Sequence, residues 1–135
     1  MYFIINSEYF AQGKGNKITF CVDAVNYSDA ETFASQKMKE IGDTFLIKSI
    51  RKANFTNVLN RDGDKYFIVV TKTIIKADSG KDKKISTTEL FQASSSEEAI
   101  KYAIEMNEQG MSDYEIFSIK ETKIMDVYCN EEQTV

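Results

Sequence analysis

Apolar, aromatic and β-branched residues are concentrated in several short stretches of the first half of the chain, and this pattern predicts β-strands. The stretches cover residues 2–10, 18–25 and 45–53. Between the second and third, the apolar spacing changes to three and four, which predicts a helix with one apolar face: Ala30, Phe33, Ala34, Met38 and Ile41. A capping box of Ser28 and Glu31 is expected to begin this helix. The first half therefore predicts the order strand–strand–helix–strand.

The second half repeats this order. Strands are expected at residues 65–76, 84–93 and 114–123. A second capping box, Ser95 with Glu98, begins a second amphipathic helix with the apolar residues Ala99, Ile100, Ala103, Ile104 and Met106. The two halves thus predict one architectural unit used twice.

The repeat is also visible in the residues themselves. A shift of 69 residues aligns residues 45–50 with residues 114–119, and Val58 with Val127. Residues 20–59 and their shifted counterparts share seven identities in forty positions, and the helix face keeps one register with the strand that follows it. We interpret this agreement as an internal duplication.

Glycine, asparagine and aspartate mark the turns between these elements. Residues 13–16 and 78–82 are expected to close hairpins, and residues 60–64 to join the two halves. Residues 60–64 contain part of a calcium-loop pattern, but the closing glutamate that such a loop requires is missing. Residues 13–16 have Asn16 where a phosphate loop needs Ser or Thr. We therefore expect turns rather than metal or phosphate sites at both places.

These features predict an α+β fold, with two helices packed on an antiparallel or mixed sheet. A right-handed crossover would make the third strand of each unit parallel to the second. The simplest layout then places it beside the first strand. The two units would then share one six-stranded sheet or form a pseudo-twofold pair. We expect a single compact domain with repeats at residues 1–59 and 65–128, followed by a short frayed tail at residues 129–135.

The composition narrows the chemistry that the chain can perform. Its 135 residues include no histidine, proline or tryptophan, and two cysteines. Without histidine there is no Ser-His-Asp or Cys-His catalysis, and two cysteines cannot make a four-thiolate zinc site. We therefore expect a protein that is not an enzyme, with no catalytic residue, metal site or cofactor. Cys21, in an apolar stretch, is expected to be a small core residue.

Location can also be inferred from the sequence. No apolar run approaches the ~20 residues that a membrane-spanning helix needs. The first residues lack the basic and apolar regions of a secretion signal. Sparse cysteine fits a reducing compartment. We expect a cytoplasmic protein with no membrane partner.

Charge is distributed unevenly along the chain. The net charge is −4, yet residues 48–84 contain ten basic and four acidic residues and carry +6. Residues 85–135 carry −8. Such segregation is typical of an interaction surface, although scattered solvated lysines are an alternative explanation.

The basic stretch supplies the candidate binding residues. They combine cationic or amide side chains with aromatic rings: Lys48, Arg51, Lys52, Asn54, Phe55, Arg61, Lys65 and Tyr66. We expect a non-catalytic binding or regulatory protein that uses this surface, near the junction of the repeats, to bind a partner protein. Single-stranded nucleic acid is an alternative partner, because it needs cations for phosphates and rings for bases. A nucleotide held between the repeats is another.

Several segments resemble a known family. Residues 23–31, 50–55, 111–116 and 122–128 resemble its "VDA-SF-EAE", "IKRANY", "MSDYEI" and "T-IMDVF" segments. Together they are typical of a domain-of-unknown-function family of Bacteroidetes and their tailed phages, and the likeness spans nearly the whole chain. One departure is Tyr2-Phe3, where the family commonly opens with "W-F/Y". The resemblance implies an intracellular protein of the bacterial host cell, encoded by such a bacterium or phage, with a host or phage protein as its partner. It implies no site residue, because the family has no established activity.

Overall fold

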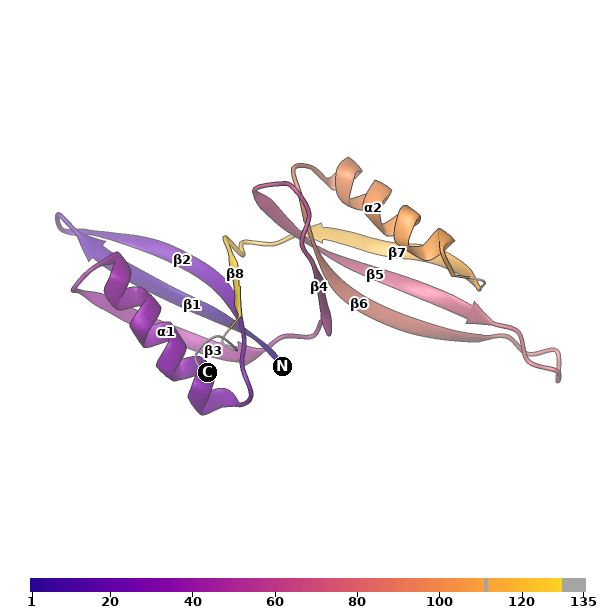
Figure 1. Cartoon of the computed structure of the whole chain (residues 1–135), viewed down its shortest axis with the longest axis horizontal. Helices are drawn as coiled ribbons and strands as arrows, with labels where there is room; N and C mark the ends of the chain where they lie inside the picture. The colour runs from indigo at the N-terminus through magenta and orange to yellow at the C-terminus, as the bar shows by residue number, and fades with distance from the viewer. Residues whose placement is uncertain (111, 130–135) are drawn as a thin grey trace. The chain divides into compact units, whose positions relative to one another are not determined.

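The computed structural model describes residues 1–110 and 112–129, and in this part of the chain it contains two helices and eight strands (Figure 1). The chain divides into two compact units. Unit 1 contains residues 1–54 and the segment from Lys123 onward, and unit 2 contains residues 55–122. Each unit is a mixed four-stranded sheet with one helix on it, so the α+β class is confirmed.

Unit 1 is built on a long hairpin. Strands β1 (Tyr2–Ala11) and β2 (Lys14–Asp23) pair antiparallel, with Ile5 opposite Phe20. The hairpin turn is Gln12 and Gly13, and both have positive φ, as a two-residue turn of this kind requires. The turn predicted at residues 13–16 therefore begins one residue earlier and is shorter.

The sheet of unit 1 has the order β3-β1-β2-β8. Strand β3 (Phe45–Lys52) lies antiparallel beside β1, as the crossover rule predicts. The short strand β8 (Val127–Cys129) pairs in parallel with β2 and was not predicted as part of this sheet. The chain thus returns to unit 1 after completing unit 2.

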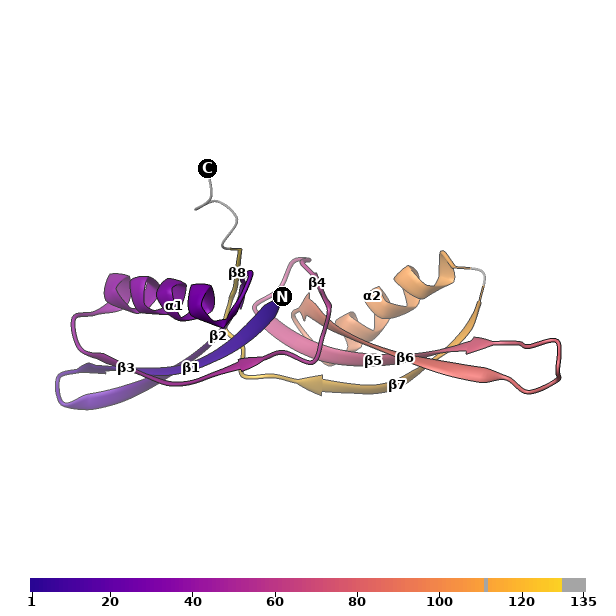
Figure 2. The same ribbon diagram turned by 90° about the horizontal axis from the view of Figure 1, so that it is seen from below.

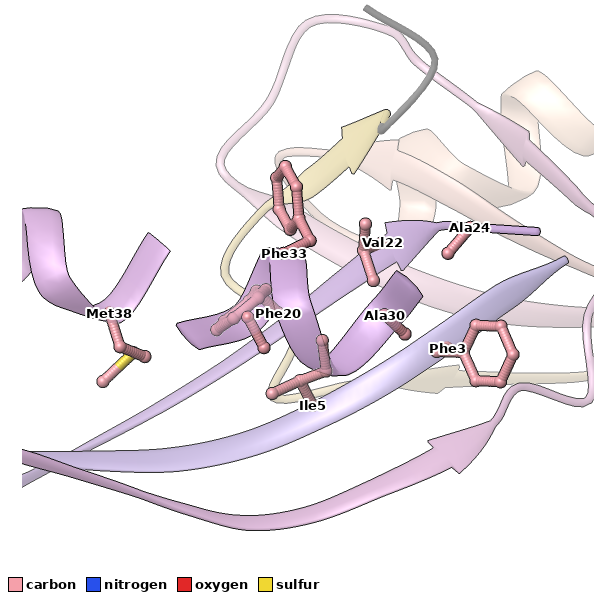
Figure 3. Packing of buried hydrophobic residues seen from close by; sticks show 9 residues of the cluster. Phe3, Ile5, Phe20, Val22, Ala24, Ala30, Phe33 and Met38 are labelled. Atoms are coloured by element: carbon pink, nitrogen blue, oxygen red, sulfur yellow. The ribbon is translucent and has the colours of Figure 1, made fainter. Parts of the chain in front are cut away.

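Helix α1 (Tyr27–Ile41) covers one face of this sheet (Figure 2). The apolar residues of the helix and sheet form a common core, shown in Figure 3: Phe3, Ile5, Phe20, Val22, Ala24, Ala30, Phe33, Ala34 and Met38. The apolar helix face predicted from the sequence is confirmed except at Ile41, which is exposed. Ile41 is the last residue of the helix.

The start of α1 differs from the prediction. Asn26 is the N-cap residue, and its side-chain oxygen accepts a hydrogen bond from the Asp29 N–H (2.9 Å). Ser28 instead lies within the first turn, where its carbonyl accepts a hydrogen bond from the Thr32 hydroxyl (3.1 Å). Asn is as strong a cap as Ser, so cap preference alone does not distinguish Asn26 from Ser28.

Unit 2 has the sheet order β4-β6-β5-β7. Strands β5 (Lys65–Ile75) and β6 (Lys83–Ala93) form a long hairpin, and β7 (Asp113–Glu121) lies antiparallel beside β5. The short strand β4 (Asn57–Leu59) pairs in parallel with β6. The described residues form two separate four-stranded sheets, so the alternative of one shared six-stranded sheet is wrong.

Helix α2 (Ser96–Glu108) packs on the sheet of unit 2 through small residues. Ala99 and Ala103 are fully buried against a core that includes Phe67, Val69, Phe91 and Ala93. Ser95 is the N-cap as predicted, since its hydroxyl accepts from the Glu98 N–H (3.2 Å).

The units do not end where the sequence repeats were expected to end. The first repeat was predicted to end at residue 59. In the structure the first segment of unit 1 ends at Asn54, and β4 belongs to unit 2. Likewise, β8 belongs to unit 1 rather than to the second repeat. Of the predicted tail, residues 130–135 lie outside the described residues, as does Met111.

None of the helices in the described part of the chain is both long and apolar enough to cross a membrane.

Candidate functional site

The eight predicted binding residues divide between the two units. Unit 1 contains Lys48, Arg51, Lys52 and Asn54, and unit 2 contains Phe55, Arg61, Lys65 and Tyr66. The two groups are therefore described separately.

Lys48 lies at an irregularity of strand β3. The pairing with β1 shifts here, because Asn6 lies opposite Ser49 while Ser7 lies opposite Ile47. Lys48 is the extra residue of this β-bulge. Its Nζ forms an ion pair with Glu8 Oε1 at 2.8 Å. The positive charge of Lys48 is therefore already balanced within the unit.

Arg51 and Lys52 follow on the same strand and are both exposed. Neither forms an ion pair with any residue that the structure describes. Ile50 packs against the core beneath α1, so the alternation of the strand directs Lys52 to the helix side and Arg51 to the opposite face. Asn54 is exposed just beyond the strand. The end of β3 thus presents two uncompensated cations, one on each side of the sheet.

The four residues in unit 2 have local partners or are buried. Lys65 lies 3.6 Å from Glu121 Oε1, and the guanidinium of Arg61 lies 5.0 Å from the centre of the Tyr102 ring. Phe55 is 3% exposed and Tyr66 is 4% exposed. A nucleic-acid base could stack on either ring only after a rearrangement that exposes it.

The remaining basic residues of the +6 stretch lie elsewhere in unit 2. Lys65 begins β5, and Lys76 follows its other end, so the two lie eleven residue steps apart, or roughly 35 Å at the usual rise. Near that far end, Lys76 pairs with Asp113 (3.8 Å) and Lys84 with Glu115 (3.5 Å). The stretch is continuous in sequence but does not form one patch within this unit.

A pocket of about 310 Å³ lies beside β3 in unit 1. One wall is helix α1, which contributes Tyr27, Glu31 and Ser35, and the other is the strand segment from Ile47 to Ile50. The Tyr27 hydroxyl donates a hydrogen bond to the Ile50 carbonyl at one end. This stripe of Tyr27, Glu31 and Ser35 was not predicted as part of a site, although its spacing of four residues places the three side chains on one helix face.

Unit 2 has a smaller pocket of about 220 Å³, between the end of α2 and the start of β7. It is lined by Thr73, Met106, Asn107, Gly110, Ser112 and Tyr114. These lining residues include no Lys, Arg, Asp or Glu, and the Asn107 amide already donates to the Ala103 carbonyl (2.8 Å). This pocket offers little to select a charged ligand.

Two buried ionisable groups lie outside these pockets. Burial, with a smaller effect of Asp23, raises the pKa of the Cys21 thiol to about 12, so this cysteine is not a thiolate at neutral pH. Burial also raises the pKa of Glu89, and a hydrogen bond from the Asn57 amide (3.5 Å) partly opposes the shift. Among the described residues, no three cysteines, aspartates or glutamates are grouped closely enough to hold a metal ion.

Comparison with known proteins places the chain in a family but assigns it no activity. No curated protein and no solved structure matches it. Residues 6–131 match the model of a family described as a domain of unknown function, DUF4494. Because the match covers nearly the whole chain, the protein belongs to the DUF4494 family.

Proposed function

We propose that this protein is a non-catalytic binding protein that holds an acidic segment of a protein partner at the end of strand β3. The observation that carries the proposal is the pair of exposed cations, Arg51 and Lys52, which lack an ion-pair partner among the described residues. Exposed charges of one sign that are not balanced locally attract a partner of the opposite sign.

An acidic protein segment is favoured over the two alternative ligands. Single-stranded nucleic acid gains much of its affinity from stacking on open aromatic faces, and Phe55 and Tyr66 are buried. A nucleotide would need cations around a pocket, but the pocket beside β3 contains Glu31, and its Lys48 is paired with Glu8. A protein segment can reach Arg51 and Lys52 from outside without entering that pocket.

The experiment compares capture of partners from bacterial lysate by the wild type and by the double variant Arg51→Glu/Lys52→Glu. A matched control is Lys101→Glu/Lys120→Glu, which reverses two exposed lysines of unit 2 that form no ion pair among the described residues. We expect the first double variant to lose a protein that the wild type and the control retain. Capture that nuclease treatment abolishes would instead favour nucleic acid.

We also propose that the two units arose by duplication and then diverged. The binding surface at the end of β3 would then belong to only one of the two copies, unit 1. The support is a common register. Val127 pairs in parallel with Cys21, and Val58 pairs in parallel with Leu90. A shift of 69 residues turns Val58 into Val127 and Cys21 into Leu90, so the two pairs are equivalent, and in each pair the valine comes from the other half of the chain. The bulges at Lys48 and Phe117 are related by the same shift. In unit 2, the ring of Phe117 lies 3.7 Å from Lys72 Nζ, where unit 1 has the Lys48–Glu8 pair.

The proposed place of action is the cytoplasm of a bacterial cell, where the partner is a host or phage protein. The two cysteines are not joined in a disulfide, which is consistent with a reducing compartment. The motif resemblance to proteins of Bacteroidetes and their phages directs the choice of lysate.

A further inference from the structure

Strand β3 is an edge of the sheet in unit 1. It has eight residues, and β1 is its only neighbour in the described part of the sheet. The opposite edge is the three-residue strand β8. Long edge strands expose unpaired backbone groups that can accept another strand, whereas short edges offer little to pair with. The open edge of β3 is therefore the better template for strand addition.

The backbone groups of β3 that face this edge can be assigned from the ladder. In an antiparallel pair, opposed residues alternate between pairs that exchange both hydrogen bonds and pairs that exchange none. The Ala53 N–H donates to the Tyr2 carbonyl (2.8 Å), so two residues earlier Arg51 also directs its backbone toward β1. Ile50 and Lys52 consequently direct their N–H and carbonyl groups toward the open edge.

The residues of β3 before the bulge at Lys48 follow the same alternation. The Phe10 N–H donates to the Thr44 carbonyl (3.0 Å), so the alternation directs the backbone of Ile47 toward the open edge. The Tyr27 hydroxyl already donates to the outward carbonyl of Ile50, which agrees with the assignment. Ile47, Ile50 and Lys52 thus offer a row of outward groups along the edge.

The pocket beside β3 lies along this row. Its strand wall runs from Ile47 to Ile50, and its helix wall is the stripe of Tyr27, Glu31 and Ser35. An extended segment laid against β3 would place side chains alternately toward the helix and toward the open face of the sheet. Toward the helix it would meet Lys52 near one end and Glu31 further along, and toward the open face it would meet Arg51.

We infer that β3 binds an extended acidic peptide segment by strand addition, with backbone hydrogen bonds to the open edge and carboxylates beside Arg51 and Lys52. This inference rests on the proposed function and adds the mode of binding. Main-chain pairing supplies affinity in such complexes, and side chains that alternate between two faces supply specificity. The cations on both faces favour acidic residues at consecutive positions of the segment, and Glu31 disfavours an acidic residue beside it.

The test uses a fluorescein-labelled peptide of about ten residues, long enough to span β3, in which two consecutive Glu residues are flanked by Val and Thr. Two analogues carry N-methyl groups on every second backbone nitrogen, one on the odd positions and one on the even positions. Each analogue keeps all the carboxylates but removes the N–H donors from one edge of the peptide. Fluorescence anisotropy measures the affinity of all three peptides for the full chain.

Strand addition predicts that one analogue binds about tenfold more weakly or worse, because several hydrogen bonds are lost, while the other binds nearly as well as the parent. It also predicts that the backbone amides of Ile47, Ile50 and Lys52 exchange with deuterium more slowly in the complex. Equal binding of both analogues would overturn strand addition. In that case, sensitivity to Arg51→Glu/Lys52→Glu would leave the proposed charge recognition standing. Failure of the parent peptide to bind would overturn both.

Discussion

The hydroxyl of Tyr27 donates a hydrogen bond to the backbone carbonyl of Ile50, and this bond ties the first turn of α1 to the open edge of β3. The Tyr27 ring also meets the Phe3 ring edge to face, with the centroids 5.8 Å apart. One residue therefore closes an end of the pocket beside β3 and protects an outward carbonyl. An added strand would therefore pair with the other outward groups of β3 and leave the Ile50 carbonyl to Tyr27.

Replacement of Tyr27 by Phe removes that hydrogen bond and keeps the ring against Phe3. We expect the free energy of unfolding to fall by about 0.5–1.5 kcal/mol, the usual net value of such a bond. Urea denaturation measures the change. Tyr9→Phe is the matched control, since Tyr9 is partly buried beside the same core and its hydroxyl has no hydrogen-bond partner among the described residues. An equal loss in both variants would argue against the Tyr27 bond.

Gly63 is required by both its backbone and its surroundings. Its φ is +152°, and a Cβ at this position would lie 2.6 Å from the Ala93 carbonyl oxygen and 2.7 Å from the Ala93 Cα. We expect Gly63→Ala to lower the free energy of unfolding by about 2 kcal/mol or more, because the backbone of β6 must move. Thermal unfolding checks this prediction.

Gly42 supplies the control for Gly63. It ends helix α1 with an extended φ of −174°, and a Cβ added there would have no atom within 4 Å. Gly42→Ala should change the unfolding free energy by less than about 1 kcal/mol. A Gly63→Ala variant as stable as Gly42→Ala would contradict the close approach to Ala93.

Glu89 should make stability depend on pH. Its pKa is raised in the folded state by burial, so folding favours the protonated form. The stabilising contribution is complete below the ordinary value of 4.5 and is lost as the pH rises through the raised pKa. Glu89→Gln keeps an acceptor for the Asn57 amide and removes the charge, so it should stabilise the protein at pH 7 and do so less as the pH falls. Denaturation midpoints at several pH values measure this, and a stabilisation that does not vary with pH would contradict it.

The elements of the fold could be predicted because each has a strong local signal. The helix faces follow from Ala30, Phe33 and Ala34 and from their counterparts, and the place of β3 beside β1 is the simplest layout of a crossover that makes β3 parallel to β2. The N-cap of α1 was misplaced by two residues, since Asn26 and Ser28 are equally good caps. Only the tertiary structure decides between two such neighbours.

The short strands could not be predicted as members of their sheets. Strands β4 and β8 have three residues each, too few to show a period of two, and they pair with β6 and β2 rather than with their chain neighbours. Val58 and Val127 aligned in the repeat, but the alignment could not show that each lies in the sheet of the other half.

The candidate site was predicted in part. The basic segment of β3 was identified, but the sequence could not show that Lys48 is balanced by Glu8 while Arg51 and Lys52 are not balanced by any described residue. Such pairing depends on the register between β1 and β3. The pocket beside β3 was not predicted, because in the sequence Glu31 and Ser35 are indistinguishable from residues of an ordinary solvated helix face. Only the tertiary structure shows that they lie next to β3.

The most direct measurement is a charge-swap binding experiment. The affinity of the Glu-containing peptide and of a matched Lys-containing peptide is measured by fluorescence anisotropy against the wild type and Arg51→Glu/Lys52→Glu. Recognition by charge predicts that the wild type binds the acidic peptide at least about tenfold more tightly, and that the variant reverses this preference. Lys101→Glu/Lys120→Glu should keep the preference of the wild type. An unchanged preference in the Arg51→Glu/Lys52→Glu variant would contradict the assignment of the binding surface to the end of β3.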